Sequence, residues 1–287
     1  PHIQYLEDKS GNLLFEDMGN PEILTRFQLN QKEIPSFGIT DATYWFFFEY
    51  EFINKTEGYL LEIEYPLLDE VTFFYTNNQD ELIQKVVGDT FPFAQREFEH
   101  RNFLFSLRDL KWKGKIFFKI RTSGSMQVPI SIHKQKYFLE KDQKFLALQM
   151  IFLGIMGAMI LYNTLLGFSL KDKTYFFYIF YVVSVTLFET SLNGISYQFF
   201  WKNFTYWNAV SIPIFVSLSN IGISAFIISF LKLKNNLPFL NKVFRLIIVS
   251  SIICVLLSFF VSDSKIIKLA MLFTAISSLL SIFSAFL

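Results

Sequence analysis

Five long apolar stretches after residue 146 constrain the fold of this chain more than any other feature. They span approximately residues 147–170, 175–196, 209–231, 244–261 and 266–287. Each is close to the ~20 residues with which a helix crosses about 30 Å of hydrocarbon. Core helices of a soluble protein are the alternative interpretation, but five in succession with short polar links favour a membrane. We therefore predict an all-α transmembrane bundle over residues 147–287.

Charge divides the chain at the same place. Residues 1–144 contain 17 Lys and Arg against 22 Asp and Glu, whereas residues 145–287 contain 9 against 3. The front half therefore has the composition of a mildly acidic soluble domain. This argues against nucleic acid as a partner, because phosphate binding needs a basic face. Cys254 is the only cysteine, so no intrachain disulfide can form.

The basic residues between the apolar stretches indicate an orientation. If the front domain lies outside, the inner loops are 171–174 and 232–245. These loops carry six cationic residues: Lys171, Lys173, Lys232, Lys234, Lys242 and Arg245. The outer loops carry three: Lys202, Lys265 and Lys268. Cytoplasmic loops are enriched in Lys and Arg, so we expect the front domain outside the cytoplasm.

Few polar side chains lie within the spanning stretches. They are Asn163, Glu189, Asn193 and Asn220. Glu189 is the only acid deep in a stretch, and such a residue is a functional hypothesis by default. A protonated or amide-paired packing group is the alternative, and the sequence leaves both open. Gly154 and Ala158 form one small-xxx-small pair, a weak indication of close helix packing.

Alternation with period two dominates residues 44–133 and predicts strands. One aromatic face of "YWFFFEYEF" comprises Tyr44, Phe46, Phe48, Tyr50 and Phe52. "GKIFFKI" predicts a buried face of Ile116, Phe118 and Ile120 and an exposed face of Lys115, Phe117 and Lys119. "QVPISIH" alternates in the same way, and the other strand candidates are residues 59–65, 70–76, 82–87 and 102–107. The pairs Glu49/Glu51 and Glu62/Glu64 are typical of a solvated strand face.

Seven short strands separated by turn-forming segments predict an antiparallel β-sandwich over residues 1–136. Near its start, the segment "YLEDKSGNLLFEDM", residues 5–18, has the pattern of a polar strand and turn. Residues 137–146, "YFLEKDQKFL", contain neither Gly nor Pro, so we predict a stiff link to the first membrane helix. A stiff link is suited to transmitting a change in the orientation of the domain to the helix bundle.

The segment "GDTFPFAQREFEHRNFLFSL", residues 88–107, concentrates polar side chains between phenylalanines. Candidate ligand contacts are Arg96, His100, Arg101, Asn102 and Trp45, because long cationic and aromatic groups suit sugar hydroxyls and ring faces. Arg96 would grip a carboxylate or phosphate, or else bind the carbonyls of its own loop. Gly88–Asp89 is typical of a turn. The chain shows no zinc spacing, no phosphate-binding glycine motif and no catalytic constellation, so we predict neither metal nor cofactor.

The run "YWFFFEYEF…LLEIEYPLLDEVTFFY…GDTFPFAQREFEHRNFLFSL…FFKIRTSGSMQVPISI" resembles the periplasmic sensor domain of bacterial seven-transmembrane receptors with diverse intracellular signalling modules. The stretch "LGIMGAMILYNTLLGFSLKDKTYFFYIFYVVSVTLFETSLNGISYQFFW" resembles the seven-helix region of the same family. The resemblance covers nearly the whole chain. It implies a jelly-roll-like sandwich, similar to carbohydrate-binding domains, followed by seven helices of which about five are present. It also implies an inner (cell) membrane location with the sandwich in the periplasm.

We therefore expect a signalling receptor that binds a small polar or carbohydrate-like ligand outside the membrane. Its other expected partners are the lipid bilayer, a cytoplasmic output domain further along the same chain, and, as a candidate, a second copy of the receptor. We expect a signal peptide before residue 1. A membrane-tethered carbohydrate-active enzyme is one alternative, but the sequence offers no obvious carboxylate pair. A transporter is another, and only Glu189 and a few Asn would serve it.

Overall fold

The structure is a computed structural model that describes residues 3–52, 58–260, 269, 272–276 and 279–280. Its N-terminal part is built from eleven described strands. They are β1 (Gln4–Asp8), β2 (Gln28–Leu29), β3 (Ser36–Ile39), β4 (Thr43–Glu51), β5 (Tyr59–Ile63), β6 (Glu70–Thr76), β7 (Leu82–Val87), β8 (Phe103–Ser106), β9 (Lys113–Arg121), β10 (Ser125–Gln127) and β11 (Ile130–Lys134). The short helices η1 (Phe15–Gly19), α1 (Pro21–Leu24) and η2 (Phe93–Gln95) lie between them.

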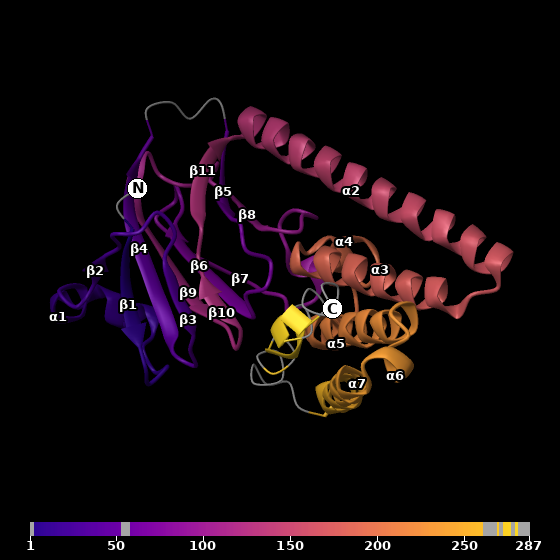
Figure 1. The fold of residues 1–287 in the computed structure, drawn as a ribbon. Helices are drawn as coiled ribbons and strands as arrows, with labels where there is room; N and C mark the ends of the chain where they lie inside the picture. Colours follow the sequence, from indigo (N-terminus) through magenta and orange to yellow (C-terminus); the bar gives the residue numbers. More distant parts are fainter. Residues whose placement is uncertain (1–2, 53–57, 261–268, 270–271, 277–278, 281–287) are drawn as a thin grey trace. The chain divides into compact units, whose positions relative to one another are not determined.

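The strands form antiparallel sheets, as the alternation predicts (Figure 1). The largest has six strands in the order β2-β1-β4-β9-β6-β7. A second sheet has the order β11-β5-β8, and β10 pairs with β3. The predicted strands 70–76 and 82–87 have the observed bounds of β6 and β7. The finer assignment as a jelly roll stays a prediction.

The main core lies between the two larger sheets. Phe46 on β4 lies opposite Phe118 on β9, which in turn lies opposite Phe73 on β6. From the smaller sheet, Leu61 and Phe105 join the same buried cluster. The aromatic face predicted for β4 therefore points into a sandwich core, and the antiparallel sandwich is confirmed.

The opposite face of the six-stranded sheet is also buried, which the alternation did not predict. Trp45, Phe47 and Phe117 form a second cluster there. Phe15, from η1, stacks against Phe74 at 4.7 Å and meets Phe117 edge-on at 5.7 Å. The prediction that Phe117 is exposed is wrong, because residues 13–27 fold over this face and cover it.

Six helices follow the sandwich between Gln135 and Ser258. They are α2 (Gln135–Leu170), α3 (Lys173–Leu192), α4 (Ile195–Phe199), α5 (Thr205–Phe230), α6 (Leu233–Asn236) and α7 (Pro238–Ser258). Four of these, α2, α3, α5 and α7, are long and apolar enough to cross a membrane. They correspond to the first four predicted stretches. The fifth, 266–287, lies largely outside the described residues.

The predicted link over residues 137–146 is not a separate element. These residues are helical and belong to α2, which runs without a break for 36 residues from Gln135. The physical reason is that "QKYFLEKDQKFL" contains good helix formers and neither Gly nor Pro. Residues up to Asp142 nevertheless group with the sandwich, and so do Asn193–Thr205.

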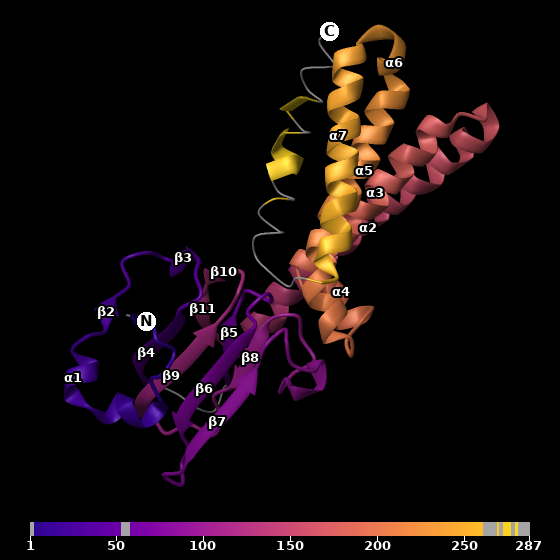
Figure 2. The ribbon, with the colours of Figure 1, turned by 90° about the horizontal axis from the view of Figure 1, so that it is seen from below.

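Close packing inside the helical unit occurs away from the predicted small-residue pair. Gly154 has open space where a Cβ would stand, whereas a Cβ on Gly222 of α5 would lie 2.8 Å from the Cα of Tyr181 on α3. Thr174 and Ser229 share a hydrogen bond of 2.6 Å between the same two helices. α7 lies alongside α5 (Figure 2), where Phe244 and Ile227 belong to one buried cluster.

Replacement of Phe118 by Ala should destabilise the sandwich by about 3–5 kcal/mol, because it opens a cavity in a close-packed core. Phe118 is fully buried and its ring lies 4.9 Å from that of Phe73. The measurement is urea unfolding of the full chain in lipid nanodiscs, followed by tryptophan fluorescence. Leu82→Ala, at a half-exposed position, is the control and should change stability by less than about 1 kcal/mol. Equal effects would contradict the core assignment.

Candidate functional site

Residues 88–102 form the loop between β7 and β8, and its first residues lie against β6. A Cβ on Gly88 would collide with the backbone carbonyl of Asp69, so only glycine fits there. Asp89 donates its backbone N–H to the carbonyl of Leu68 at 2.9 Å. The hydroxyl of Thr90 donates to the carbonyl of Asp69 at 2.6 Å. These contacts fix the start of the loop on the sheet.

Arg96 faces its own loop. Its Nη1 donates to the backbone carbonyls of His100 and Arg101 at 2.8 and 2.6 Å. Its guanidinium carbon lies 4.6 and 4.5 Å from the ring centroids of Phe93 and Phe103, and 5.6 Å from that of Tyr197. We call these three rings the aromatic cage. Cation–π contact of this kind is strongest where water is excluded, and Arg96 is only 8% exposed.

Arg96 and Asp89 are both poorly solvated. Within the described part of the chain, Nε and Nη2 of Arg96 have no hydrogen-bond acceptor. Burial lowers the pKa of Arg96 to about 10. Burial, reinforced by the charge of Asp69 and opposed by that of Arg96, raises the pKa of the Asp89 carboxyl to about 7. Asp89 and Arg96 are therefore both held where their charged forms are costly.

His100 and Arg101 bind the beginning of α2. The backbone N–H of Asn102 donates to Nδ1 of His100 at 3.1 Å, so the neutral imidazole carries its hydrogen on Nε2. Nε2 lies 3.0 Å from Oδ1 of Asp142 and donates to it. Nη1 of Arg101 contacts the same carboxylate oxygen at 2.6 Å. The Asp142 carboxylate on α2 is thus contacted by both side chains, His100 and Arg101.

A second carboxylate, on β5, completes this connection. Glu62 is 1% exposed. It accepts hydrogen bonds from Nδ2 of Asn102 at 2.7 Å and from Nζ of Lys141 at 3.0 Å. Lys141 also donates to Glu64 at 2.6 Å. A buried carboxylate needs such partners to stay ionised at an acceptable cost.

The contacting residues of α2 share one helix face. Phe138, Lys141 and Asp142 are spaced by three and four residues, which places them side by side on a helix. The ring of Phe138 is buried with Leu60 and Leu104 of the smaller sheet. The first two turns of α2 are therefore fixed to the sandwich by one apolar contact and two groups of ion pairs.

The segment Asn193–Thr205, which joins α3 to α5, packs on the same loop. The Tyr197 hydroxyl donates to the carbonyl of Phe91 at 2.8 Å, and its ring meets Phe93 edge-on at 5.4 Å. Nε2 of Gln198 donates to the carbonyl of Glu99 at 2.9 Å. Lys202 pairs with the Glu99 carboxylate at 2.9 Å. Loop 88–102 therefore holds both the start of α2 and the α3–α5 connection.

Gly194 allows this segment to approach. Its φ of +69° is a left-handed conformation that favours glycine. A Cβ there would lie 2.8 Å from the side chain of Pro66 and 3.3 Å from that of Arg101. Both the backbone conformation and the available space require glycine.

Four of the five predicted ligand residues come together in this arrangement. Arg96, His100, Arg101 and Asn102 are all buried, and their side chains bond to the loop, to α2 or to β5. Trp45 lies apart in the second cluster and is 0% exposed, with Lys119 5.5 Å from its ring centroid. A ligand role for these five residues stays a prediction.

The predicted polar residues of the helices lie at separate places. Nδ2 of Asn163 donates to the carbonyl of Met159 on its own helix at 2.8 Å. Glu189 is half-buried on α3 and Asn193 is half-buried just after α3. Nδ2 of Asn220 donates to the hydroxyl of Thr274 at 3.0 Å. The functional role of Glu189 stays a prediction.

Three residues of the site were not found from the sequence. Glu62 was assigned to a solvated face, which is wrong because the first turns of α2 cover that face; Glu64 on the same face is exposed. Asp142 lay in the predicted link, where its spacing from Phe138 was an unused indication of a helix face. Tyr197 lay just after the predicted membrane stretch 175–196, and no local pattern indicated its contact with the loop.

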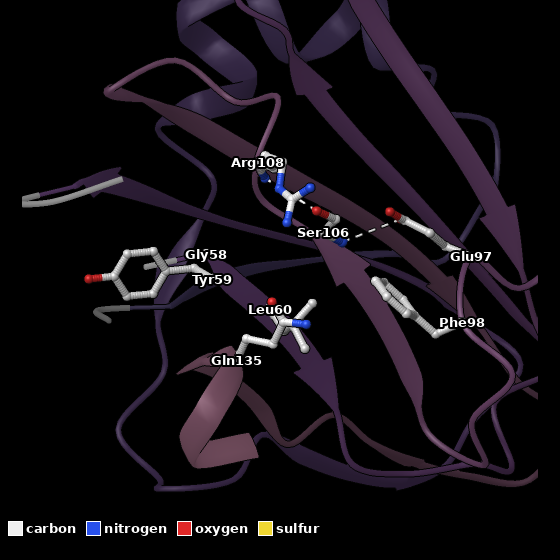
Figure 3. A pocket seen from close by; sticks show the side chains of 8 residues that line it. All are labelled: Gly58, Tyr59, Leu60, Glu97, Phe98, Ser106, Arg108 and Gln135. Carbon is white, nitrogen blue, oxygen red and sulfur yellow. Dashed lines mark hydrogen bonds between the residues drawn. The ribbon is translucent and has the colours of Figure 1, made fainter. Parts of the chain in front are cut away.

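Two of the cavities on the described surface of the sandwich are of a size that suits a small ligand. One of about 300 Å³ is lined by Gly58, Tyr59, Leu60, Glu97, Phe98, Ser106, Arg108 and Gln135 (Figure 3). The other, of about 370 Å³, lies over Phe15, Phe74 and Phe117 and includes three lysines, Lys111, Lys113 and Lys115. The first contains Gln135, the residue with which α2 begins. Among the described residues no three His, Cys, Asp or Glu side chains gather as metal ligands.

A sandwich followed by four helices long and apolar enough to cross a membrane is the architecture of a multi-pass membrane protein with a folded N-terminal domain. Two protein-family models match the chain. The model described as "7TMR-DISM extracellular 2" matches residues 1–134, and the one described as "7TM diverse intracellular signalling" matches residues 145–287. The chain belongs to the family of seven-transmembrane receptors with diverse intracellular signalling modules. No curated protein matches it.

The stability of the sandwich should fall as pH rises from about 4 to about 7. Unfolded, Asp89 loses its proton near its ordinary pKa of 3.8, whereas in the folded chain its pKa is about 7. Between these pH values the folded state binds more protons than the unfolded state. Each unit of rising pH therefore lowers the free energy of unfolding by up to about 1.4 kcal/mol. Urea unfolding of the full chain in nanodiscs, at pH values between about 5 and 8, measures this. Asp89→Asn should remove most of the slope, whereas Asp41→Asn, on the surface, should keep it. A slope unchanged in Asp89→Asn would refute the assignment.

Asp142→Asn should loosen the first turns of α2. It removes the carboxylate that Arg101 contacts, and breaking a buried ion pair costs about 3–5 kcal/mol. We expect amide hydrogen exchange over residues 135–145 of the full chain to rise at least about tenfold, which corresponds to about 1.4 kcal/mol. Lys202→Gln, which breaks an exposed pair, is the control and should leave these amides unchanged. Equal exchange in both variants would show that the Asp142 contacts do not fix α2.

Proposed function

We propose that this chain is a bacterial inner-membrane receptor whose periplasmic sandwich senses a small polar or carbohydrate-like ligand. The sandwich passes the change through the helices to a cytoplasmic output domain of the same receptor. One observation carries the proposal: loop 88–102 contacts both the start of α2, through Asp142, and the α3–α5 connection, through Tyr197. Two membrane-entering parts of the chain thus depend on the position of one loop.

The energetics of these contacts suit a switch. A ligand shifts a conformational equilibrium only by its difference in affinity for the two states. Coupling between sites is typically about 1–3 kcal/mol, which is comparable to the loss of one cation–π contact or a few buried hydrogen bonds. Rearrangement of the aromatic cage around Arg96 would therefore change the free energy by enough to account for coupling of this size.

The charge distribution of the loops supports the orientation. The connections 171–174 and 232–245 carry six cationic residues, as is usual on the cytoplasmic side. In that orientation Asn193–Thr205 lies on the periplasmic side, with the sandwich that it contacts. The proposal assigns ligand binding and transmission, and no catalysis, to the described residues.

The test of transmission compares two changes at Tyr197 in the full chain in nanodiscs. Tyr197→Ala removes the ring from the cage, whereas Tyr197→Phe removes only the hydroxyl bond to Phe91. We expect hydrogen exchange over residues 193–205 to rise at least about tenfold in the first, or about 1.4 kcal/mol, and much less in the second. A panel of monosaccharides and amino acids is then added to the wild-type chain and to both variants.

A ligand that signals should alter exchange in loop 88–102, in residues 135–145 and in residues 193–205 of the wild-type chain. Tyr197→Ala should still bind that ligand but lose its effect on residues 193–205. If a bound ligand changes exchange in the strands alone, and neither helix-connecting segment responds, the sandwich binds without transmitting and the proposal is overturned.

A further inference from the structure

The cavity beside Gln135 places a candidate ligand against the first residue of a membrane-entering helix. Its walls come from the start of β5, the end of β8 and residues 97–98 of the loop. The backbone N–H of Gln135 donates to the carbonyl of Gly58 at 3.2 Å, so α2 begins on the cavity wall. Gln135 also lies on the helix face of Phe138 and Asp142, at three- and four-residue spacing.

One wall presents two opposite charges. In Figure 3 Arg108 and Glu97 flank Ser106, while Leu60 and Gln135 face them. Oε2 of Glu97 accepts hydrogen bonds from Nζ of Lys85 at 2.7 Å and from the backbone N–H of Ser106 at 3.3 Å. Within the described part of the chain, Oε1 of Glu97 and the guanidinium of Arg108 have no such partner. The guanidinium of Arg108 and Oε1 of Glu97 can therefore bind a ligand in the cavity.

The rest of the lining is apolar and small. Leu60 is buried, and Phe98 packs against the cluster of Leu60, Leu104 and Phe138. The volume of about 300 Å³ is at the lower end of the range for small-molecule sites. The site accordingly suits a compact ligand with a short apolar group.

We propose that this cavity binds a small zwitterion of the α-amino acid type. Its carboxylate would pair with Arg108, its ammonium with Glu97, and its side chain would lie on Leu60 and Phe98. Arg recognises a carboxylate in bidentate fashion, and Oε1 of Glu97, the oxygen that Lys85 does not contact, would accept from the ammonium. This inference rests on the proposed function and names the ligand class and the place where it acts.

The second cavity fits such a ligand less well. Two of its lysines, Lys111 and Lys115, already pair with Asp80 and Glu49. Its lining contains no residue of α2, so occupancy there has no direct path to a membrane helix. It therefore serves as the control site.

The test is calorimetric titration of the full chain in nanodiscs. The probes are L-leucine and L-glutamine, with N-acetyl-L-leucine lacking the ammonium, 3-methylbutylamine lacking the carboxylate, and glucose carrying no charge. We expect at least one of the two amino acids to bind and the three other probes to bind at least about tenfold more weakly. Arg108→Gln and Glu97→Gln should each raise its Kd at least about tenfold, which corresponds to about 1.4 kcal/mol. Lys113→Gln, in the second cavity, should leave the Kd unchanged.

Several outcomes would overturn the inference: no amino acid binds, N-acetyl-leucine binds as tightly as leucine, or Lys113→Gln weakens binding as much as Arg108→Gln. Unchanged hydrogen exchange in β4 and β9 verifies that each variant is folded. The Tyr197 variants separate this inference from the proposed function, because Tyr197 does not line the cavity. If glucose alters exchange over residues 135–145 and 193–205 while no amino acid binds, the receptor proposal stands and the zwitterion site falls.

Discussion

The pairing of buried charges on the face of the smaller sheet that α2 covers determines where the first membrane-entering helix begins. Arg101 and Glu62 are almost completely buried, and each would be costly without an opposite charge. Both obtain it from α2, where Asp142 and Lys141 occupy adjacent positions. The helix therefore cannot rotate or slide at its start without exposing Arg101 and Glu62 to an unpaired, poorly solvated environment.

The same loop that carries Arg101 also carries Arg96, and this links the two contacts physically. Arg96 donates to the carbonyls of His100 and Arg101, so the guanidinium in the aromatic cage sets the backbone from which Arg101 reaches Asp142. Tyr197 forms one wall of that cage. A displacement of Arg96 would consequently disturb the α3–α5 connection and the α2 contact together, without any contact between those two segments.

Local periodicity predicted the sheets well, because alternation depends on neighbouring residues alone. Phe46 and Phe118 were assigned to apolar strand faces by the alternation, and the structure buries both in the main core. Burial of Phe117 and Glu62 depends on segments far away in the sequence, residues 13–27 and α2, which cover strand faces that would otherwise be solvated. The contact of Tyr197 with Phe91 and Phe93 joins residues about a hundred positions apart, and no periodicity encodes such a contact.

The arrangement also explains why the polar residues of loop 88–102 resemble a catalytic or ligand site. Arg, His and Asn are selected for binding because they make directional, charge-assisted hydrogen bonds, and holding a helix in a defined position requires the same property. In this chain Arg96, Arg101 and Asn102 use those bonds on carbonyls and carboxylates of the receptor itself. Arg108, whose guanidinium has no such partner in the described residues, lies just beyond β8 and lines the open cavity that also contains Gln135 of α2. The buried polar cluster and the proposed ligand cavity are joined by the short stretch of α2 between Gln135 and Asp142.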